Sequence, residues 1–376
     1  MAAIMAAIME ITENIMRRMR EPSTKLHNAL YFMSGMMVVI LALVIVAGVK
    51  TKAENAGFHI TDDTENSYEQ QVAGQTDTTQ DSGQEKWQEG VVTYQGKEYL
   101  YNTDIKTYLM MGVDIDGPVQ QSSDYTQGGQ SDALFLLVVN NKTEQLQVIS
   151  INRNTMADIE LCDEEGIDMG PLKTQICLQH AFGDGKRLSC SKTVDAVSGL
   201  FQNIPISGYL AMNMGGIPQM NDAVGGVEVT VQQDISFPKA GVNLKKGQKV
   251  TLNGTQAYYY LHGRDTEEYD SATKRLQREE QYIVAYMDKL KKVSTENPDQ
   301  VTEIYNSVSD YLVTSVDFTS MIEQLMNYGF SEDQMYTVPG KTVEGKPIDG
   351  KRYEEYHVDE DAMEELIMKV FYTPVQ

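Results

Sequence analysis

The chain has 376 residues, and its 54 acidic against 31 basic side chains give a formal net charge of −23. This length allows one large domain or two ordinary ones, and an apolar share of 41% is enough for a sizeable core, which excludes global disorder. The acidity excludes broad contact with nucleic acid, and the three cysteines exclude a disulfide-scaffolded mini-domain and a paired C-x-x-C metal site.

One segment near the N-terminus indicates a membrane anchor. Residues 29–49 read ALYFMSGMMVVILALVIVAGV, a run of 21 residues without a charge. At about 1.5 Å per residue a helix of this length spans about 31 Å, which matches the hydrocarbon core of a bilayer. A secretory signal peptide is the alternative, but its apolar region is usually shorter and ends in a small-x-small cleavage site. We therefore predict one transmembrane helix over residues 29–49.

The flanking charges predict how this helix is oriented. Four basic residues precede it and two follow it closely: Arg17, Arg18, Arg20 and Lys25, then Lys50 and Lys52. Because basic residues concentrate on the cytoplasmic side, we expect residues 1–28 to form a cytoplasmic segment and the chain beyond the helix to be extracellular. The protein is then a single-pass protein of the cell membrane.

The composition changes sharply after this helix. The 40 residues from Thr51 to Gly90 contain nine acidic residues, two lysines and only two branched aliphatic residues, Ile60 and Val72. Such a stretch cannot bury enough apolar surface to offset its chain entropy. We predict that residues 50–90 form a disordered acidic stalk that lifts a domain from the membrane.

Alternating and continuous apolar runs predict the first strands of that domain. Residues 91–102 form a hairpin with Gln95-Gly96 at its turn, and residues 107–114 (TYLMMGVD) form an apolar strand. Residues 133–140 (ALFLLVVN) and 145–152 (QLQVISIN) form a second hairpin. The first strand of this second hairpin is apolar at consecutive positions, so we expect it to be central and buried on both faces.

Helices and strands alternate in the rest of the chain. Apolar spacing predicts a helix over residues 191–201, a strand–helix–strand unit over 207–231 and a long helix over 271–293. Two amphipathic stretches follow, at 316–328 and 359–371, and no linker separates them from the domain before them. We predict a three-layer α-β-α domain with a central mixed sheet over residues 91–293, with residues 294–376 as its continuation.

Carboxylates and arginines gather at the predicted ends of these elements. Asp114 ends one strand, Asp132 begins the next, and Arg153 follows the strand after that. Arg275 and Arg278 lie one turn apart on the long helix. Arginine pairs with phosphate oxygens and two carboxylates can hold Mg²⁺ against the same phosphates, so this set suits a phosphate or diphosphate ligand. Surface ion pairs and helix caps would explain any one of these residues taken singly.

The run from about Thr107 to Val293 resembles the extracellular catalytic domain of the LytR–CpsA–Psr family. The segments that carry the resemblance occur in the family's order, and the ordered series is more specific than any single piece: MGVD, QSDALFLLVV, VISINRNT, QHAFGDG, NDAVGGVEVTV, LNGTQAYYYLHGRD and a helix with R-x-x-R. The predicted anchor ahead of the domain and the tail behind it are also similar to this family.

The resemblance implies a phosphotransferase of Gram-positive cell envelopes. Family members take an anionic glycopolymer, such as teichoic acid or capsule polysaccharide, from an undecaprenyl diphosphate carrier. They attach it through a phosphodiester to peptidoglycan, typically at N-acetylmuramic acid. The polyprenyl tail lies in an apolar tunnel between sheet and helices, which Met212, Met214 and Met220 would help to line here.

The resemblance also implies roles for individual residues. Asp114 and Asp132 would anchor Mg²⁺, or Mn²⁺, which suits the same oxygen ligands. The arginines would neutralise charge on the transferred phosphoryl group: Arg153, Arg264, Arg275 and Arg278. Either Asp132 or Asp270 would orient or deprotonate the sugar hydroxyl.

Several positions depart from the family pattern. His262 replaces the first arginine of the usual Arg-x-Arg, which removes a fixed charge, and Glu279 stands where glutamine is common. The usual Pro-Arg-Asp reads Asn152-Arg153-Asn154, and Asp270 lies further from Arg275 than is normal. We expect His262, Arg278 and Glu279 to contact the substrate.

A second hypothesis belongs to another functional class. A non-catalytic envelope protein that binds polyprenyl phosphates or regulates other enzymes, like a transcriptional attenuator, would need the same arginines. The paired aspartates favour the enzyme, whereas His262 favours the alternative. We expect a monomer that binds no nucleic acid.

Three cysteines lie in one segment of the extracellular part: Cys162, Cys177 and Cys190. A Cys177–Cys190 disulfide and buried free thiols are both open at this point. We expect His180, in QHAFGDG, to be a packed or hydrogen-bonded residue rather than a ligand.

Overall fold

A central mixed sheet organises the protein. The computed structural model describes residues 91–264, 269–297, 299–317, 321, 325–345 and 353–375. The six strands of the sheet are, in spatial order, β13 (Leu312–Thr314), β8 (Gly208–Asn213), β3 (Ile105–Val113), β4 (Ser131–Asn140), β5 (Gln145–Ile151) and β14 (Met335–Thr337). The pairs β3–β8 and β5–β14 are parallel and the other pairs are antiparallel, so the expected mixed sheet is confirmed.

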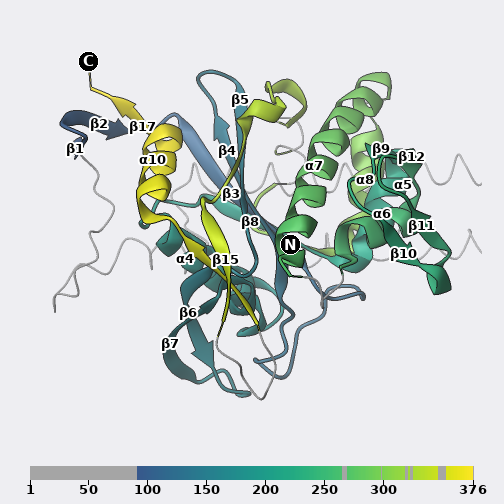
Figure 1. The fold of residues 1–376 in the computed structure, drawn as a ribbon, viewed down its shortest axis with the longest axis horizontal. Helices are drawn as coiled ribbons and strands as arrows, with labels where there is room; N and C mark the ends of the chain where they lie inside the picture. Colours follow the sequence, from purple (N-terminus) through teal and green to yellow (C-terminus); the bar gives the residue numbers. More distant parts are fainter. Residues whose placement is uncertain are drawn as a thin grey trace, which may run out of the picture. The chain divides into compact units, whose positions relative to one another are not determined.

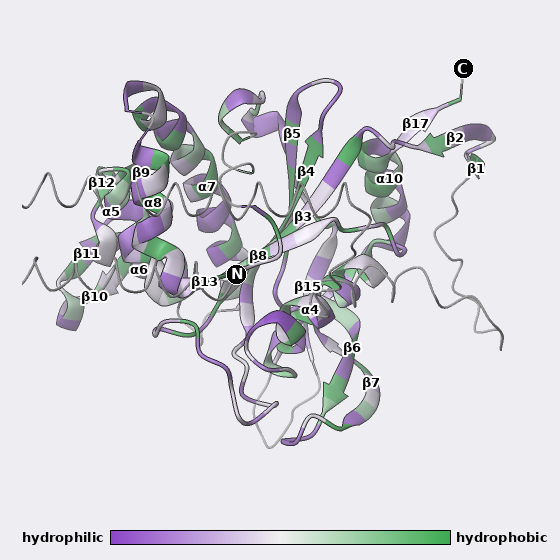
Figure 2. Cartoon of the chain, turned by 180° about the vertical axis from the view of Figure 1, so that it is seen from behind, coloured by the Kyte–Doolittle hydropathy of each residue, from purple (hydrophilic) through white to green (hydrophobic). Residues whose placement is uncertain are grey.

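Helices cover both faces of this sheet (Figure 1). One face packs against α4 (Arg187–Leu200) and α10 (Glu360–Phe371). The other face is covered by α5 (Ile217–Ala223), α6 (Gly254–His262), α7 (Ser271–Glu296) and α8 (Gln300–Val308). Along α7 hydrophobic and hydrophilic residues alternate, as expected of a helix with one buried face (Figure 2).

Short hairpins and strand pairs surround the three layers. The N-terminal hairpin β1 (Val91–Tyr94) and β2 (Lys97–Tyr101) pairs with the C-terminal strand β17 (Tyr372–Pro374). The remaining pairs are β6 (Met156–Cys162) with β7 (Asp168–Gln175), β9 (Val227–Thr230) with β12 (Lys249–Leu252), β10 (Ile235–Phe237) with β11 (Val242–Leu244), and β15 (Gly340–Glu344) with β16 (Glu354–Val358).

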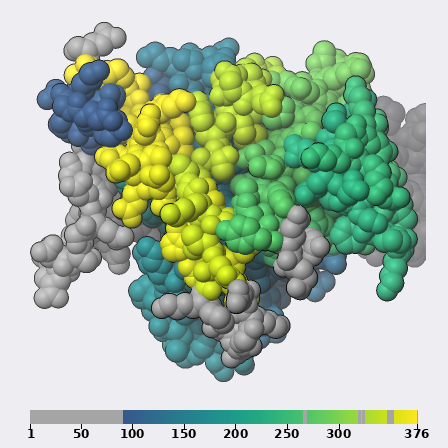
Figure 3. All heavy atoms as spheres, viewed as in Figure 1, coloured from purple at the N-terminus to yellow at the C-terminus, as the bar shows by residue number. Residues whose placement is uncertain are grey.

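The C-terminal residues belong to the same compact unit as the strands before them. β13 and β14 are the two edges of the central sheet, and β17 extends the N-terminal hairpin. In Figure 3 the C-terminal residues (yellow) lie on the surface between the N-terminal hairpin (dark blue) and the helices beyond it (green). Residues 294–376 therefore continue the domain rather than form a separate one within the described part of the chain.

Most predicted elements are present, with shifted ends. The hairpin over residues 133–152 has the predicted pairing, and β4 is buried on both faces. The helix predicted over 191–201 begins earlier, at Arg187, because the Asp184 carboxylate accepts hydrogen bonds from backbone N–H groups of its first turn. The stretch at 316–328 falls partly outside the described residues.

Of the two alternatives left open for the cysteines, the structure shows buried free thiols. The Cys177–Cys190 disulfide is absent: all three thiols are free and buried. Cys177 Sγ packs 3.0 Å from an Arg153 nitrogen, whereas Cys190 Sγ lies 3.7 Å from His180 Nε2, so each sulfur has a different partner.

The predicted transmembrane helix at 29–49 and stalk at 50–90 lie outside the described residues. No helix within the described ranges is both long and apolar enough to cross a bilayer.

Candidate active site

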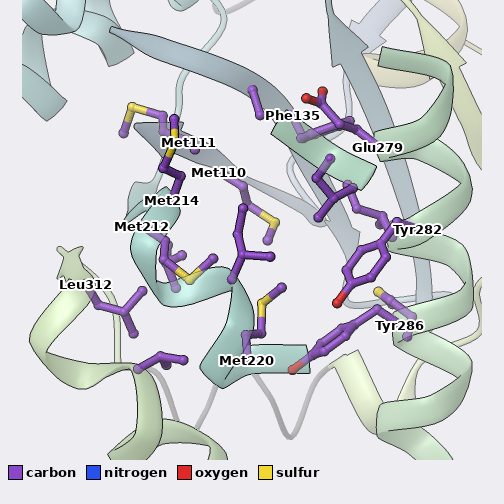
Figure 4. A pocket seen from close by; sticks show the side chains of 18 of the residues that line it. Met110, Met111, Phe135, Met212, Met214, Met220, Glu279, Tyr282, Tyr286 and Leu312 are labelled. Atoms are coloured by element: carbon purple, nitrogen blue, oxygen red, sulfur yellow. The ribbon is translucent and has the colours of Figure 1, made fainter. Parts of the chain in front are cut away.

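A cavity of about 230 Å³ opens between the central sheet and α7. Its walls are almost entirely apolar, and methionines from β3, β8 and the start of α5 point into it opposite Tyr282 and Tyr286 of α7 (Figure 4). Four polar or charged side chains besides the tyrosines of α7 line it, and they gather at one end: Asp132, His262, Arg275 and Glu279. The cavity therefore has a charged mouth and an apolar body.

One stripe of α7 runs along the whole cavity. The lining residues of this helix recur every three or four positions, which places them on one face: Arg275, Glu279, Tyr282, Ile283, Tyr286, Met287 and Leu290. At about 1.5 Å per residue this stripe is about 22 Å long, with its charged end at the N-terminal side of the helix. The remaining wall at the far end comes from α8 and from Leu325.

Asp132, at the start of β4, is the centre of the charged mouth. Arg275 Nη1 lies 2.9 Å from Asp132 Oδ2, and Arg275 Nη2 donates to the Asp132 backbone oxygen over 2.9 Å. Arg153 Nε lies 3.1 Å from Asp132 Oδ1. The Arg275 side chain is only 3% exposed, so this pairing is largely removed from water. The sequence expectation that these three residues come together is thus realised in space.

The mouth carries more positive than negative charge near Asp132. Burial alone would raise the pKa of Asp132, but Arg275 and Arg153 outweigh it and hold this pKa below its ordinary value. Arg264 makes no ion pair or hydrogen bond with any residue that the structure describes. Burial and the repulsion of Arg275 and Arg153 lower the pKa of Arg264. A mouth with one shared carboxylate and a third guanidinium that has no partner among the described residues favours an anionic ligand.

Asp114 lies at the end of β3, beside the start of β4. Its Oδ1 accepts a hydrogen bond of 2.6 Å from the Gln130 N–H. Partial desolvation, and to a smaller extent the charge of Asp132, raise the pKa of Asp114, so the two carboxylates interact. Asp132 Oδ1 is buried and has no well-directed hydrogen bond from any described residue. An underused buried oxygen next to a second carboxylate fits a divalent cation with oxygen ligands.

The described residues contain no cluster of three or more histidine, cysteine, aspartate or glutamate side chains with metal-binding geometry. A Mg²⁺ ion at Asp114 and Asp132 would therefore take its other ligands from water and from substrate phosphates. This is the usual way in which proteins bind Mg²⁺ at phosphoryl-transfer sites.

His262 and Glu279 border the mouth, and both are neutral over part of the physiological pH range. Burial, followed by the charge of Arg275, lowers the pKa of His262, so its imidazole is uncharged at neutral pH. Its ring centroid lies 5.4 Å from that of Tyr258. Burial raises the pKa of Glu279 to about 7, although Arg275 Nε lies 3.3 Å from Glu279 Oε1. His262 therefore offers a hydrogen bond rather than a fixed charge.

Two expected site residues have other partners. Arg278 is buried and does not line the cavity; its guanidinium donates to the carbonyl oxygens of Tyr260 (2.7 Å) and Gly263, at the C-terminal end of α6. The last carbonyls of a helix need such donors, which explains this orientation. The Asp270 carboxylate accepts a hydrogen bond of 2.6 Å from Thr342 of β15, and it does not line the cavity either.

Sequence reasoning missed four residues that contact this set. Gln130 contacts Asp114 and Arg153, and Cys177 contacts Arg153. Tyr258 Oη donates to Asp116 Oδ1 over 2.7 Å, near His262, and the Glu354 carboxylate of β16 accepts the Asp270 N–H. Gln130 and Tyr258 lay inside quoted motifs, but neither was singled out. The other contacts join segments that are distant in sequence, so no local pattern reports them.

Comparisons with known proteins agree with this geometry. A model of the LytR_cpsA_psr family matches residues 61–370. A polyisoprenyl-teichoic acid–peptidoglycan teichoic acid transferase, TagU, of Enterococcus faecalis is 30% identical over 61% of this chain and 67% of its own length. The TagU of Halalkalibacterium halodurans is 28% identical over 58% of this chain and 64% of its own length. The chain thus spans about two thirds of these relatives.

The fold also occurs among solved structures. The crystal structure of TagV from B. subtilis superimposes with a TM-score of 0.55 at 21% sequence identity. The superposition covers 72% of this chain and 96% of the TagV chain. At this level of identity the likeness concerns the fold.

Proposed function

Since the chain belongs to the LytR–CpsA–Psr family, we propose that it transfers a glycopolymer from a polyprenyl diphosphate carrier to peptidoglycan. The observation that carries this proposal is that one cavity combines an apolar body with a charged mouth. The apolar body of the cavity ends at a mouth that Arg275 lines. Arg153 joins this mouth through Asp132, and Arg264 lies close enough to both arginines for them to add to burial in lowering its pKa. A lipid diphosphate has the same two parts in the same order.

The apolar body suits a polyprenyl chain better than a compact ligand. Its walls are methionines, tyrosines and branched aliphatic side chains, with no charged group beyond the mouth. Methionine is flexible and polarisable and adapts to irregular apolar ligands. Burial of each isoprene unit would contribute about 25 cal/mol for every Å² of apolar surface removed from water.

The arginines at the mouth would bind the diphosphate and stabilise its charge during transfer. Arg275 and Arg153 are held by Asp132, so their guanidinium groups are in place before substrate binds. Preorganised cations of this kind act strongly because they need no rearrangement at the moment of reaction. Arg264 adds charge without a protein partner among the described residues.

Asp114 and Asp132 would hold Mg²⁺, or Mn²⁺, at the mouth. When bound, the metal would supply positive charge against the phosphate oxygens on which negative charge accumulates. The adjacent strand ends and the underused Asp132 Oδ1 support this assignment.

The reaction proposed is an in-line phosphoryl transfer. The acceptor hydroxyl oxygen forms a bond to the phosphorus that carries the glycan, and the bond from this phosphorus to the bridging oxygen breaks. Polyprenyl phosphate leaves with the electron pair, and the glycan becomes linked to peptidoglycan through a phosphodiester. Of the two carboxylates considered for the hydroxyl proton, we assign it to Asp132, which lines the cavity, rather than to Asp270. The low pKa of Asp132 suits late proton transfer, as in loose phosphoryl-transfer transition states.

A non-catalytic lipid-binding protein is the second candidate, and one observation favours it. His262 supplies no fixed charge at the mouth, so the site has one cation fewer than the family pattern. Under this hypothesis the cavity retains the lipid and no transfer follows. In both cases we propose anchoring by the helix at residues 29–49, with the described domain outside the cell.

The test uses the full chain in detergent with a radiolabelled undecaprenyl diphosphate oligosaccharide and peptidoglycan oligomers. We expect label in the peptidoglycan with Mg²⁺ and none with a chelator. Arg264→Ala should clearly reduce transfer, whereas the matched control Arg187→Ala, an exposed arginine of α4 on the other side of the sheet, should not. Lipid retention without transfer, across several donor glycans, would support the second candidate instead.

A further inference from the structure

Gln130, the residue before β4, contacts three members of the charged mouth. Its N–H donates to Asp114 Oδ1 over 2.6 Å. Its carbonyl oxygen accepts from the N–H groups of Asp114 (3.0 Å) and Asp132 (3.1 Å). Its side-chain Oε1 accepts a hydrogen bond from Arg153 Nη2. One residue thus joins both aspartates at the strand ends to the arginine that faces them.

The side-chain contact fixes the direction of Arg153. The same Nη2 lies 3.0 Å from Cys177 Sγ, and Cys177 is fully buried, so this nitrogen is enclosed. Arg153 Nε lies 3.1 Å from Asp132 Oδ1, without a well-directed hydrogen bond. Because that second contact is poorly aligned, the Gln130 hydrogen bond is the better-directed restraint on Arg153.

The loop that carries Gln130 is itself held firmly. Both neighbouring carbonyl oxygens, of Gly128 and Gly129, lie 3.1 Å from His180 Nδ1, and burial lowers the pKa of His180, so this ring is neutral. Gly129 has φ of +81°, and a Cβ there would lie 2.8 Å from Val113 Cγ1. The backbone position of Gln130 is therefore independent of its own side chain.

The neutral amide has an electrostatic consequence. Asp132 is shared between Arg153 and Arg275, and Gln130 satisfies Arg153 without adding a negative charge. A carboxylate at the same place would accept the same hydrogen bond and would cancel charge that an anionic ligand needs.

We propose that Gln130 is a positioning residue: its side-chain amide aims Arg153 at the transferred phosphoryl group while leaving the charge of Arg153 available to it. This inference rests on the proposed function, because it concerns how an arginine of the proposed transfer site is oriented. A positioning role differs from a purely structural one because the orientation of Arg153 and the charge near Arg153 can be changed and measured separately.

Two variants separate these contributions, with Gln127→Ala, an exposed glutamine of the same loop, as the control. Gln130→Ala removes the restraint on Arg153, and we expect kcat for transfer to fall about ten- to a hundredfold with a smaller change in KM, since small misplacements cost this much. Gln130→Glu restores the hydrogen bond, so kcat should recover to within a few-fold, while KM for the lipid diphosphate should rise about tenfold. That rise should shrink in high salt.

A binding measurement distinguishes failure of the inference from failure of the proposed function. Farnesyl diphosphate is titrated into each full-length variant in detergent, and thermal unfolding is followed in parallel. If the wild type binds the probe but transfers no glycan, the proposed function fails. In that case, a Gln130→Glu protein that binds the probe about tenfold more weakly still supports the positioning of a charged Arg153. Equal losses in both variants together with an equally lowered Tm would overturn the inference, as would a Gln130→Ala protein that behaves like Gln127→Ala.

Discussion

The two faces of the central sheet are built from the same strands, but they differ where the cavity lies against the face covered by α7. On the face covered by α4 and α10, alternate residues of β3, β4 and β5 are fully enclosed: Leu109, Leu134, Leu136, Ile149 and Ile151 are 0% exposed. On the face covered by α7, Leu137, Val139 and Val148 are also buried, but Met110 of β3 and Met212 of β8 are only partly buried and line the cavity.

This difference shows which face serves stability and which serves ligand binding. Protein interiors normally fill their space, and an unfilled apolar cavity reduces stability. On the α7 face, methionines of β3 and β8 and tyrosines of α7 leave space between sheet and helix. The charged mouth lies at the edge of that open side, so lipid and diphosphate would be bound together.

The largest effect should follow from removal of the guanidinium that borders the open face. Arg275→Ala removes two contacts to Asp132 and one to Glu279, and it leaves Asp132 paired with Arg153 alone. We expect kcat for transfer to fall about 10²- to 10³-fold, as for other preorganised donors. Arg275→Lys keeps the charge but loses the paired geometry, and it should recover only part of the rate.

Truncations on the two faces should differ in cost. Leu136→Ala, on the closed face, should lower the free energy of unfolding by about 2–5 kcal/mol, because it creates a cavity in a filled core. Met212→Ala, on the open face, should cost less than about 2 kcal/mol, because it enlarges a cavity that already exists, but it should weaken farnesyl diphosphate binding. Urea titrations of both variants provide the comparison. Equal costs would show that the faces are packed alike.

The pH dependence of stability should report the buried Glu279. Its pKa rises from 4.5 to about 7 on folding, so the folded protein keeps a proton that the unfolded chain releases. The stability that this group contributes is fully present below pH 4.5 and is lost as the pH rises to about 7. Relative to Glu279→Gln, the wild type should therefore lose on the order of 1–3 kcal/mol over this range. A constant difference between the two proteins across the range would contradict the assignment.

The smallest effect should come from adding a fixed positive charge at the mouth of the cavity. His262→Arg places a fixed guanidinium beside the cavity mouth, where the native imidazole is neutral at pH 7 because burial and Arg275 lower its pKa. We expect farnesyl diphosphate to bind several-fold more tightly at low salt, with the gain reduced at high salt. An unchanged affinity would place His262 outside the phosphate site.

Much of the architecture could be predicted from sequence because its signals are local. The continuous apolar run of β4 and the long periodicity of α7 indicate a buried strand and a covering helix, and both were found. The edge strands β13 and β14 have only three residues each and depend on pairing with distant segments, so no local pattern marks them.

In the site too, contacts that follow from the ends of strands and helices could be predicted, and contacts between distant segments could not. Asp132 and Arg275 come together because strand and helix ends fix where they lie. Arg278 follows Arg275 by three positions, which is about 60° around the helix, and this turns it toward the end of α6 instead. The contacts of Cys177 with Arg153 and of Thr342 with Asp270 depend on tertiary packing alone.

The central claim is that the open face holds the polyprenyl chain with its diphosphate at the arginine mouth. The direct measurement is photo-crosslinking of the full chain with a polyprenyl diphosphate analogue whose photoreactive group is at the tail end, followed by mass spectrometry. We predict crosslinks to the far end of the cavity, at Leu290, Ile304 or Leu325, and their loss when an unlabelled lipid diphosphate competes. Crosslinks to α4 or α10 on the closed face, or none that competition removes, would contradict the account.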